Sequence, residues 1–273
     1  MRAIDLDELK KIAEDSAKDL WDDARSVGLD TPKIILHWSA GWWDQPHKDY
    51  HINITGDGRI WLNKENLAET LPHTWKLNTG TVGVSLCCCA GATSSHLGEN
   101  PPTEKQINIM AQVVAVLCEA LGMDIGEENV LTHGEAADSE ELYDEEDLYG
   151  PNNDCERWDL QFLGTAESPR FTKDHSDPIT GGNVIRGKAI WYAQEAKRAE
   201  QKEAAWEKDM EAIQKEMDGQ KRYNTLAEMP DWAKPTIEKM IAKKLLSGDG
   251  KGLDLSRDML RVFVIHDRAG LYD

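Results

Sequence analysis

Apolar and polar positions along the first part of the chain predict a helix followed by a strand. Residues 7–27 place apolar side chains every three or four positions among charged ones, which predicts an amphipathic helix that ends at Gly28. The N-terminal residues before it share this charged, amphipathic character and are expected to be helical too. The apolar run over 33–38, between Pro32 and Gly41, predicts a short buried strand.

The middle of the chain continues the alternation of strands and helices. Residues 51–61 alternate around Gly-Asp-Gly, which is a strong signal for a hairpin turn. Residues 81–91 predict a second buried strand, and 103–123 predict an amphipathic helix with Thr103 as its N-cap. Residues 130–137 predict a third strand that ends at a histidine. Strands separated by helices favour an α/β fold, with a mixed central β-sheet flanked by helices.

The pattern changes after the third strand. Residues 138–154 are acidic and irregular, and 169–187 are rich in proline and glycine, which predicts a loop. Residues 188–222 are rich in Ala, Glu, Lys and Gln, which favours a charged helical linker. We therefore expect a main domain over 1–187, this linker, and a small helical C-terminal module over 223–273.

Charge limits the classes of partner. The 273 residues carry a net charge of −19, and because residues 195–273 are near neutral, almost all of this charge lies before them. A strongly acidic front part argues against nucleic acid, whose binding requires basic groups that neutralise phosphates. No apolar run approaches the roughly 18 residues that a membrane-spanning helix needs.

The N-terminus and the cysteines indicate where the protein is made. The first residues lack the apolar stretch and cleavage site of a secretory signal, so we expect the protein to stay in the cytoplasm where it is synthesised. Cys87, Cys88 and Cys89 are consecutive, Cys118 lies in the long helix, and Cys155 lies in a loop. An odd number of cysteines with adjacent members predicts reduced thiols rather than a disulfide framework.

Three residues could form a metal site. His37 and His133 end two of the predicted strands, and strand ends are where α/β sheets present their sites. Together with Asp159 they would supply two imidazoles and one carboxylate, which leaves the fourth tetrahedral position of a catalytic zinc open. The spacing alone does not distinguish this site from two unrelated histidines.

Several stretches resemble one known family. They are ILHWSAG, DYHINITGDGRIW, HTWKLNTGTVGVSL, PPTEKQ, LTHGEAA and RWDL, and they follow one another from about residue 33 to 163. In this order they resemble the type-2 N-acetylmuramoyl-L-alanine amidases, which include phage lysozyme-type amidases and peptidoglycan recognition proteins. The resemblance implies an amidase-like fold and zinc-dependent hydrolysis of the amide bond between N-acetylmuramic acid and L-alanine in peptidoglycan.

The resemblance also implies roles for individual residues. His37 and His133 match the two zinc histidines of the family, and Asp159 matches the third ligand, which lies two residues after a basic residue. That basic residue is Arg157 here, where most familiar members have lysine, and its role would be to stabilise the oxyanion of the transition state. Cys155 is a rival third ligand, because some relatives use cysteine.

Other matching residues surround this expected centre. Tyr50 matches a tyrosine that assists proton transfer or orients the substrate, with an ordinary strand tyrosine as the alternative. Ser85 stands where many relatives carry a glutamate general base, which leaves the base unassigned. His73 and Asn78 match residues near the peptide stem of the substrate, with a surface histidine as the alternative. Glu135 is either a hydrogen-bond partner of an imidazole or a surface carboxylate.

The C-terminal module is similar to a single surface-layer-homology repeat. Trp232 and Ala233 are expected to start one helix, and Ser256 to Met259 a second, with a glycine-rich turn between them. Such repeats usually bind secondary wall polymers in threes. A single copy leaves three alternatives open, namely weak binding, action as a homodimer, or a role in assembly only.

Together these features suggest a phage or prophage endolysin. Such an enzyme would be held in the cytoplasm of the host bacterium and released to act on the cell wall. The alternatives are a peptidoglycan recognition protein without turnover and a zinc peptidase that cuts a stem-peptide bond. The complete set of three expected ligands favours an enzyme.

Overall fold

The computed structural model describes residues 1–137, 159–219 and 221–272. The chain divides into two compact units, Met1–Arg198 and Ala199–Asp273, and each is described by itself. Among the described residues, none of the helices combines the length and the apolar character that are needed to cross a membrane.

The first unit is built on a mixed sheet, as expected. Its strands lie in the order β1-β4-β3-β5-β2-β6. The four strands β3, β5, β2 and β6 run parallel, whereas β4 pairs antiparallel with both β3 and β1. Their bounds are β1 Arg2–Ile4, β2 Lys33–Trp38, β3 Ile52–Ile54, β4 Ile60–Leu62, β5 Thr81–Leu86 and β6 Val130–Thr132.

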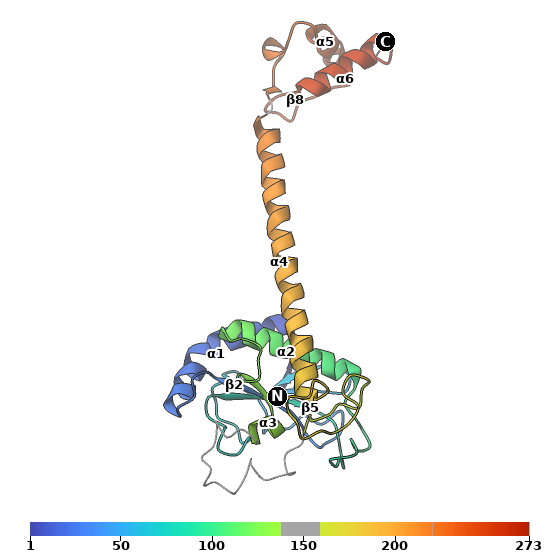
Figure 1. The fold of residues 1–273 in the computed structure, drawn as a ribbon. Coiled ribbons are helices and arrows are strands. Elements are labelled where there is room, and N and C mark those ends of the chain that lie inside the picture. The colour runs from blue at the N-terminus through green and yellow to red at the C-terminus, as the bar shows by residue number, and fades with distance from the viewer. Residues whose placement is uncertain (138–158, 220, 273) are drawn as a thin grey trace. The chain divides into compact units, whose positions relative to one another are not determined.

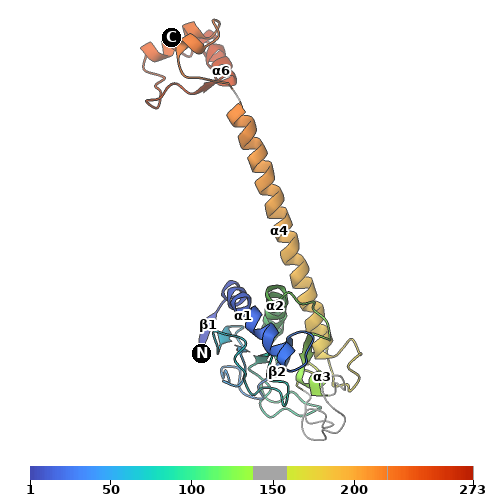
Figure 2. The same cartoon turned by 90° about the vertical axis from the view of Figure 1, so that its left-hand side faces the viewer.

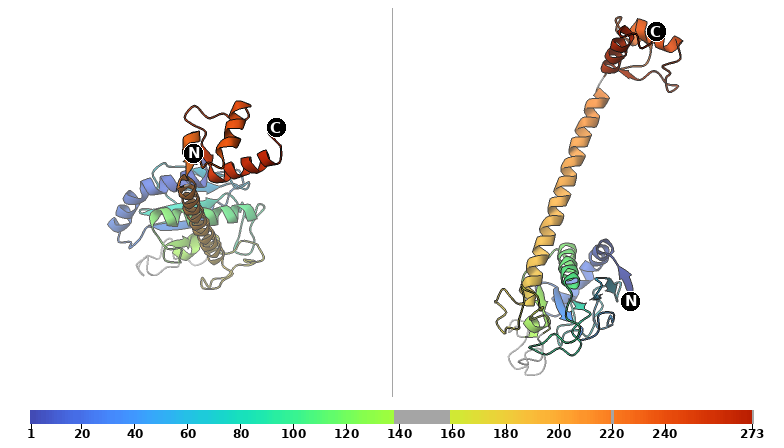
Figure 3. Two further views of the ribbon diagram at one scale, coloured as in Figure 1. Left: turned by 90° about the horizontal axis from the view of Figure 1, so that it is seen from above. Right: turned by 90° about the vertical axis from the view of Figure 1, so that its right-hand side faces the viewer.

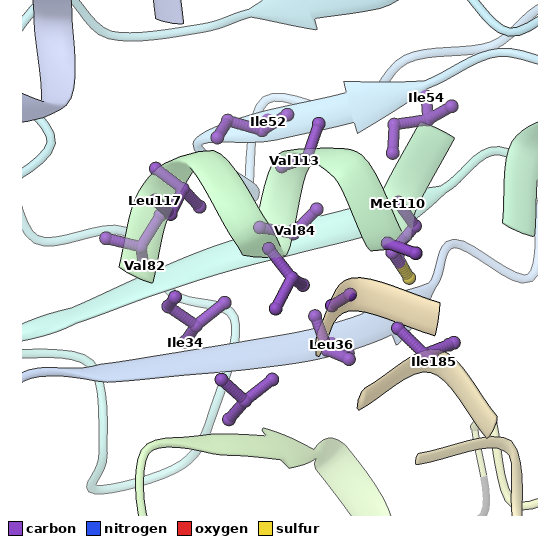
Figure 4. Close-up of a cluster of buried hydrophobic side chains, with 14 of the residues drawn as sticks. Ile34, Leu36, Ile52, Ile54, Val82, Val84, Met110, Val113, Leu117 and Ile185 are labelled. Carbon is purple, nitrogen blue, oxygen red and sulfur yellow. The ribbon is translucent and has the colours of Figure 1, made fainter. Parts of the chain in front are cut away.

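Two long helices, α1 (Leu6–Ser26) and α2 (Glu104–Leu121), cover one face of this sheet (Figures 1 and 3). They pack against each other, and Figure 2 shows both from the side. Apolar side chains from alternate strand positions pack against α2 (Figure 4), and they include Ile34 and Leu36 of β2, Val82 and Val84 of β5, and Met110, Val113 and Leu117 of α2. Because strand side chains alternate between faces, His37 points to the face opposite α2.

The helix ends follow ordinary capping chemistry. Thr103 caps α2 as predicted, since its hydroxyl accepts from the Gln106 N–H at 3.1 Å while the Gln106 side chain accepts from the Thr103 N–H at 3.0 Å. The Asp5 carboxylate caps α1 by accepting from the Glu8 N–H at 2.8 Å.

Three local predictions were wrong. The N-terminal residues are not helical, because Arg2–Ile4 form β1 and pair with β4. The third strand ends at Thr132, and His133 begins the short helix α3 (His133–Ala137). The helix α4 (Gly181–Gly219) begins inside the segment expected to be a loop, where Ile185 and Ala189 are buried in the core of the first unit.

The second unit has its own hydrophobic core. Its two main helices, α5 and α6, lie where the sequence predicted them, and Ser256 caps α6 by accepting from the Met259 N–H at 3.2 Å. The core side chains are Tyr223, Met229, Ala233, Ile237, Met240, Leu255, Leu260 and Val264. The elements are β7 Arg222–Tyr223, the 3-10 helix η1 Leu226–Glu228, α5 Lys234–Ala242, β8 Leu255–Ser256 and α6 Arg257–Arg268.

Candidate metal centre

The sheet brings the two predicted histidines together. Strands β2 and β6 are parallel neighbours, and their register places Leu36 opposite Thr132. His37 follows Leu36 and His133 follows Thr132, so both imidazoles lie at the carboxyl ends of adjacent strands. The ring centroids lie 4.7 Å apart, with one ring edge-on to the other.

Asp159 completes the group from a distant part of the chain. One of its oxygens, Oδ2, lies 3.2 Å from His37 Nδ1, and the other, Oδ1, lies 3.5 Å from His133 Nδ1. One ligand atom from each of the three residues can be chosen so that all lie within 4.8 Å of one another. The structure thus brings His37, His133 and Asp159 to one point.

The backbone after Asp159 is held by the start of α4. The carbonyl of Leu160 approaches Gly181 so closely that a Cβ there would lie 2.0 Å from the carbonyl oxygen. The Gly181 N–H also donates to the carbonyl of Gln161 at 3.2 Å. Only glycine permits this approach, so the first turn of α4 helps to fix the carboxylate beside the histidines.

The electrostatics of this group suit a divalent cation. Burial by itself raises the pKa of the Asp159 carboxyl, but the nearby imidazoles of His133 and His37 outweigh it and hold that pKa below its usual range. Asp159 is therefore a buried carboxylate that stays ionised. Two imidazoles and one ionised carboxylate with converging atoms are a donor set that fits zinc and leaves a coordination position open.

A second layer of polar side chains lies beneath His37. His37 Nε2 is 3.2 Å from His73 Nδ1, and His73 Nε2 is 3.2 Å from Thr81 Oγ1. Burial, with the neighbouring imidazole of His37, holds the pKa of His73 well below its usual value, so His73 is neutral. His73 is thus a buried residue rather than a surface one. Asn78 accepts a hydrogen bond from the Thr74 N–H at 2.8 Å and so fixes the turn that carries His73.

Tyr50 lies beside the same histidine. The ring centroids of Tyr50 and His37 are 4.9 Å apart. Burial and the charges of Asp159 and Asp49 raise the pKa of the Tyr50 phenol far above its usual value, although a hydrogen bond with Ser85 opposes this shift. Tyr50 therefore keeps its proton and can act as a hydrogen-bond donor at the edge of the site. Ser85 is paired with His37 across β5 and β2.

His133 is supported by a buried ion pair that the sequence did not reveal. Arg186 of α4 donates to Glu135 Oε1 and Oε2, both at 2.8 Å, and to the Val130 carbonyl at 2.8 Å. Glu135 also accepts from the Thr132 N–H at 2.7 Å, one residue before His133. The carboxylate is therefore neither a partner of an imidazole nor exposed, and it holds the backbone on both sides of the ligand.

Two predicted residues lie outside the described part of the chain. They are Arg157, the expected cation for the oxyanion, and Cys155, the rival third ligand. Their roles stay predictions, and Asp159 is the carboxylate that the structure places with the two histidines.

Comparison with known proteins gives one match. Residues 25–147 match the family model described as N-acetylmuramoyl-L-alanine amidase, a segment that includes both histidines and ends before Asp159. The match supports an amidase acting on peptidoglycan. No curated protein and no solved structure matches the chain.

Proposed function

We propose that this chain is a zinc-dependent N-acetylmuramoyl-L-alanine amidase. The observation that carries the proposal is the convergence of His37, His133 and Asp159 at the carboxyl edge of the sheet, in a chain whose residues 25–147 match that amidase family. The bond to be hydrolysed joins the lactyl carbonyl of N-acetylmuramic acid to the amino group of L-alanine. Zinc bound by these three residues would polarise that carbonyl and ease the deprotonation of water.

The surrounding side chains suit this chemistry. Tyr50 keeps its proton and lies beside His37, so it can donate a hydrogen bond to the substrate or to the attacking water. Arg157 is proposed to balance the negative charge that develops on the carbonyl oxygen. Replacement of Arg157 by alanine should therefore slow turnover while zinc stays bound. His73 and Asn78 remain proposed to lie near the peptide stem.

Mass spectrometry of digested sacculi tests the bond that is cut. The amidase should release stem peptides with a free L-alanine amino terminus and leave glycan strands with free lactyl groups. His37→Ala, prepared in the same way, is the matched inactive control. Products cut within the stem would instead indicate a peptidase, and zinc binding without any product would indicate a recognition protein.

We further propose that the enzyme acts as a phage or prophage endolysin, held in the cytoplasm of the host bacterium until the membrane is breached. The proposal is tested by producing the full chain in a bacterium whose wall it digests in vitro. Cells should keep their optical density until the membrane is permeabilised chemically and then lyse, whereas cells with His37→Ala should not. Lysis without permeabilisation would contradict retention in the cytoplasm.

The C-terminal unit is proposed to retain the enzyme on a secondary wall polymer. Its separate hydrophobic core supports a role distinct from catalysis. Removal of residues 223–273 should weaken sedimentation of the enzyme with whole walls but leave hydrolysis of soluble fragments unchanged. Equal sedimentation of both forms would remove this role.

We also propose that the enzyme forms a homodimer. In the part of α4 that belongs to the second unit, Trp206, Met210 and Ile213 are exposed at spacings that place them on one helix face. Sedimentation equilibrium of the full chain should show a dimer, and Trp206→Glu should shift it toward the monomer. A monomeric full chain would contradict the proposal.

A further inference from the structure

A chain of buried hydrogen bonds runs from β5 to the candidate zinc ligand His37. The Thr81 hydroxyl lies 2.8 Å from the Leu77 carbonyl oxygen, and Thr81 Oγ1 lies 3.2 Å from His73 Nε2. His73 Nδ1 in turn lies 3.2 Å from His37 Nε2. Thr81, His73 and His37 are all buried. The direction of these bonds can be worked out, because the first acceptor in the chain is a carbonyl and cannot donate.

The proton positions follow one from another. Thr81 has a single hydroxyl proton, which it donates to the Leu77 carbonyl, so its oxygen must accept from a proton on His73 Nε2. A His73 ring that carries this single proton has a lone pair on Nδ1. That lone pair faces the hydroxyl of Thr74 at 2.9 Å and Nε2 of His37 at 3.2 Å. Thr74 Oγ1 also lies 3.5 Å from His37 Nε2, but its single proton is donated over the shorter distance to His73 Nδ1. An unprotonated His37 Nε2 would then face lone pairs on both His73 Nδ1 and Thr74 Oγ1, so we place a proton on His37 Nε2.

This tautomer has a consequence on the other side of the His37 ring. A His37 ring that binds a metal and has its one proton on Nε2 presents a lone pair on Nδ1, which lies 3.2 Å from Asp159 Oδ2. A lone pair and an ionised carboxylate at this distance repel each other unless a cation lies between them. The second oxygen of the same carboxylate faces His133 Nδ1 at 3.5 Å, so one cation could be held by all three groups.

We propose that His73, held by Thr81, is a positioning residue that fixes the His37 imidazole with Nε2 protonated and Nδ1 as the metal ligand. This inference rests on the proposed zinc site. It gives His73 and Thr81 a role in metal affinity that neither the family match nor the predicted contact with the peptide stem assigns to them.

The packing around His73 supports a fixed ring. Gly83, between Thr81 and Ser85 on β5, leaves room for the imidazole, since a Cβ there would lie 2.7 Å from His73 Cγ. The His51 ring also packs edge-on against His73, with ring centroids 5.6 Å apart. A ring confined in this way keeps its nitrogens aimed at Thr81 and His37, which a mobile ring would not do.

Thr81→Val and Thr81→Ser form a matched pair that tests the proposal on the full-length protein. Valine keeps the shape of threonine but leaves the His73 Nε2 proton without its acceptor, whereas serine keeps the hydroxyl. Zinc affinity, measured by competition with a chromophoric chelator, should fall about 10- to 100-fold in Thr81→Val and stay near wild type in Thr81→Ser. The visible spectrum of the cobalt-substituted protein should shift only in Thr81→Val.

A second measurement needs no substitution and so does not depend on the folding of a variant. In the zinc-loaded wild-type protein with ¹⁵N-labelled histidines, the ring of His37 should show a metal-bound Nδ1 and a protonated Nε2. Ligation through His37 Nε2 would overturn the proposal, and so would equal zinc affinity in Thr81→Val and wild type.

The outcomes separate this inference from the proposed function. A wild-type protein that binds no zinc would overturn both. A wild-type protein that binds zinc and releases muropeptides, together with a Thr81→Val variant of unchanged zinc affinity, would overturn only the positioning role. If His73 acted only on the peptide stem, Thr81→Val would raise KM for muropeptides and leave metal affinity unchanged, which would also overturn it.

Discussion

His37 and His133 are neighbours at the candidate centre, yet the protein holds them in different ways. His37 lies within β2, is fully buried, and has side-chain partners on both ring nitrogens. His133 is the first residue of α3, its side chain is 12% exposed, and the fixed groups around it belong to Thr132, Glu135 and Arg186. The ring of the first histidine is held, whereas it is the backbone of the second that is held.

This difference predicts which substitutions should weaken metal binding and which should lower the free energy of unfolding. Substitution of Thr81 or His73 changes which His37 nitrogen carries the proton and how that ring is oriented, so it should affect metal binding more than the free energy of unfolding. Substitution of Arg186 or Glu135 breaks the buried ion pair next to His133, so it should lower the free energy of unfolding more than it affects metal binding.

Loss of either imidazole should abolish both metal retention and turnover. His37→Ala and His133→Ala each leave two protein ligands, too few for a stable catalytic site. Zinc content by mass spectrometry and release of muropeptides should both fall to background. His96→Ala, which changes an exposed histidine with no assigned role, is the control and should keep both. Full zinc content in either ligand variant would remove that histidine from the site.

Loss of Arg186 should lower the stability of the first unit. Arg186→Met leaves the buried Glu135 carboxylate without its charged partner, which typically costs about 3–5 kcal/mol. Urea denaturation of the metal-free protein measures this change. Arg261→Met breaks an exposed ion pair with Asp258 and should cost less than about 1 kcal/mol. Wild-type stability of Arg186→Met would show that the ion pair does not hold the turn of His133.

Acid should destabilise the fold through His51, on the side of His37. Its Nδ1 accepts from the Gly83 N–H at 3.0 Å and its Nε2 donates to the Glu69 carbonyl at 2.8 Å, so the folded state requires neutral His51. Burial lowers the pKa of His51 from 6.5 to about 4. Below pH 6.5 the unfolded chain therefore binds a proton that the folded chain does not, and stability should fall between these values and then level off.

The size of this loss is on the order of 3 kcal/mol, since each pKa unit corresponds to about 1.4 kcal/mol. His51→Gln keeps an amide donor and acceptor but does not titrate, so its stability should vary less across the same pH range. Urea denaturation at several pH values measures both proteins. Parallel curves for the two would rule out His51 as the group responsible.

The smallest effect is expected at the cap of α3. The Thr132 hydroxyl accepts from the Glu135 N–H at 3.1 Å, and loss of such a cap costs about 1 kcal/mol. Thr132→Ala should therefore shift the urea midpoint slightly, and Thr132→Ser should restore most of the loss. A change as large as that of Arg186→Met would mean that the cap, rather than the ion pair, dominates.

The pattern along the chain predicted most of the fold because its signals are local. The apolar run of β2, the glycine-centred hairpin and the capped helix α2 all lie where the sequence placed them. The strand β1 was missed because three residues are too short to show a period, and they are ordered by pairing with β4. The start of α4 was missed because its glycines, Gly181 and Gly182, indicate a loop unless the close contacts of Leu160 and Glu135 are known.

At the candidate site, the sequence predicted only those residues that match a motif of the resembled family. His37, His133 and Asp159 came from that resemblance, and the parallel register of β2 and β6 explains why the two histidines meet. Thr81 and Arg186 could not be predicted, because their importance depends on partners brought close by the tertiary fold. The small and polar residues at alternate positions of β5 were the one available hint of a polar face.

The reach of α4 into the first unit determines how short an active version of this protein can be. A piece cut at the limits of the family match, 25–147, would lack Asp159 and would leave Glu135 without Arg186. A minimal enzyme needs the chain through at least Ala189, whose side chain is buried in the same core. Shortened versions of the chain should therefore end within α4 at a residue after Ala189, well past the end of the family match at residue 147.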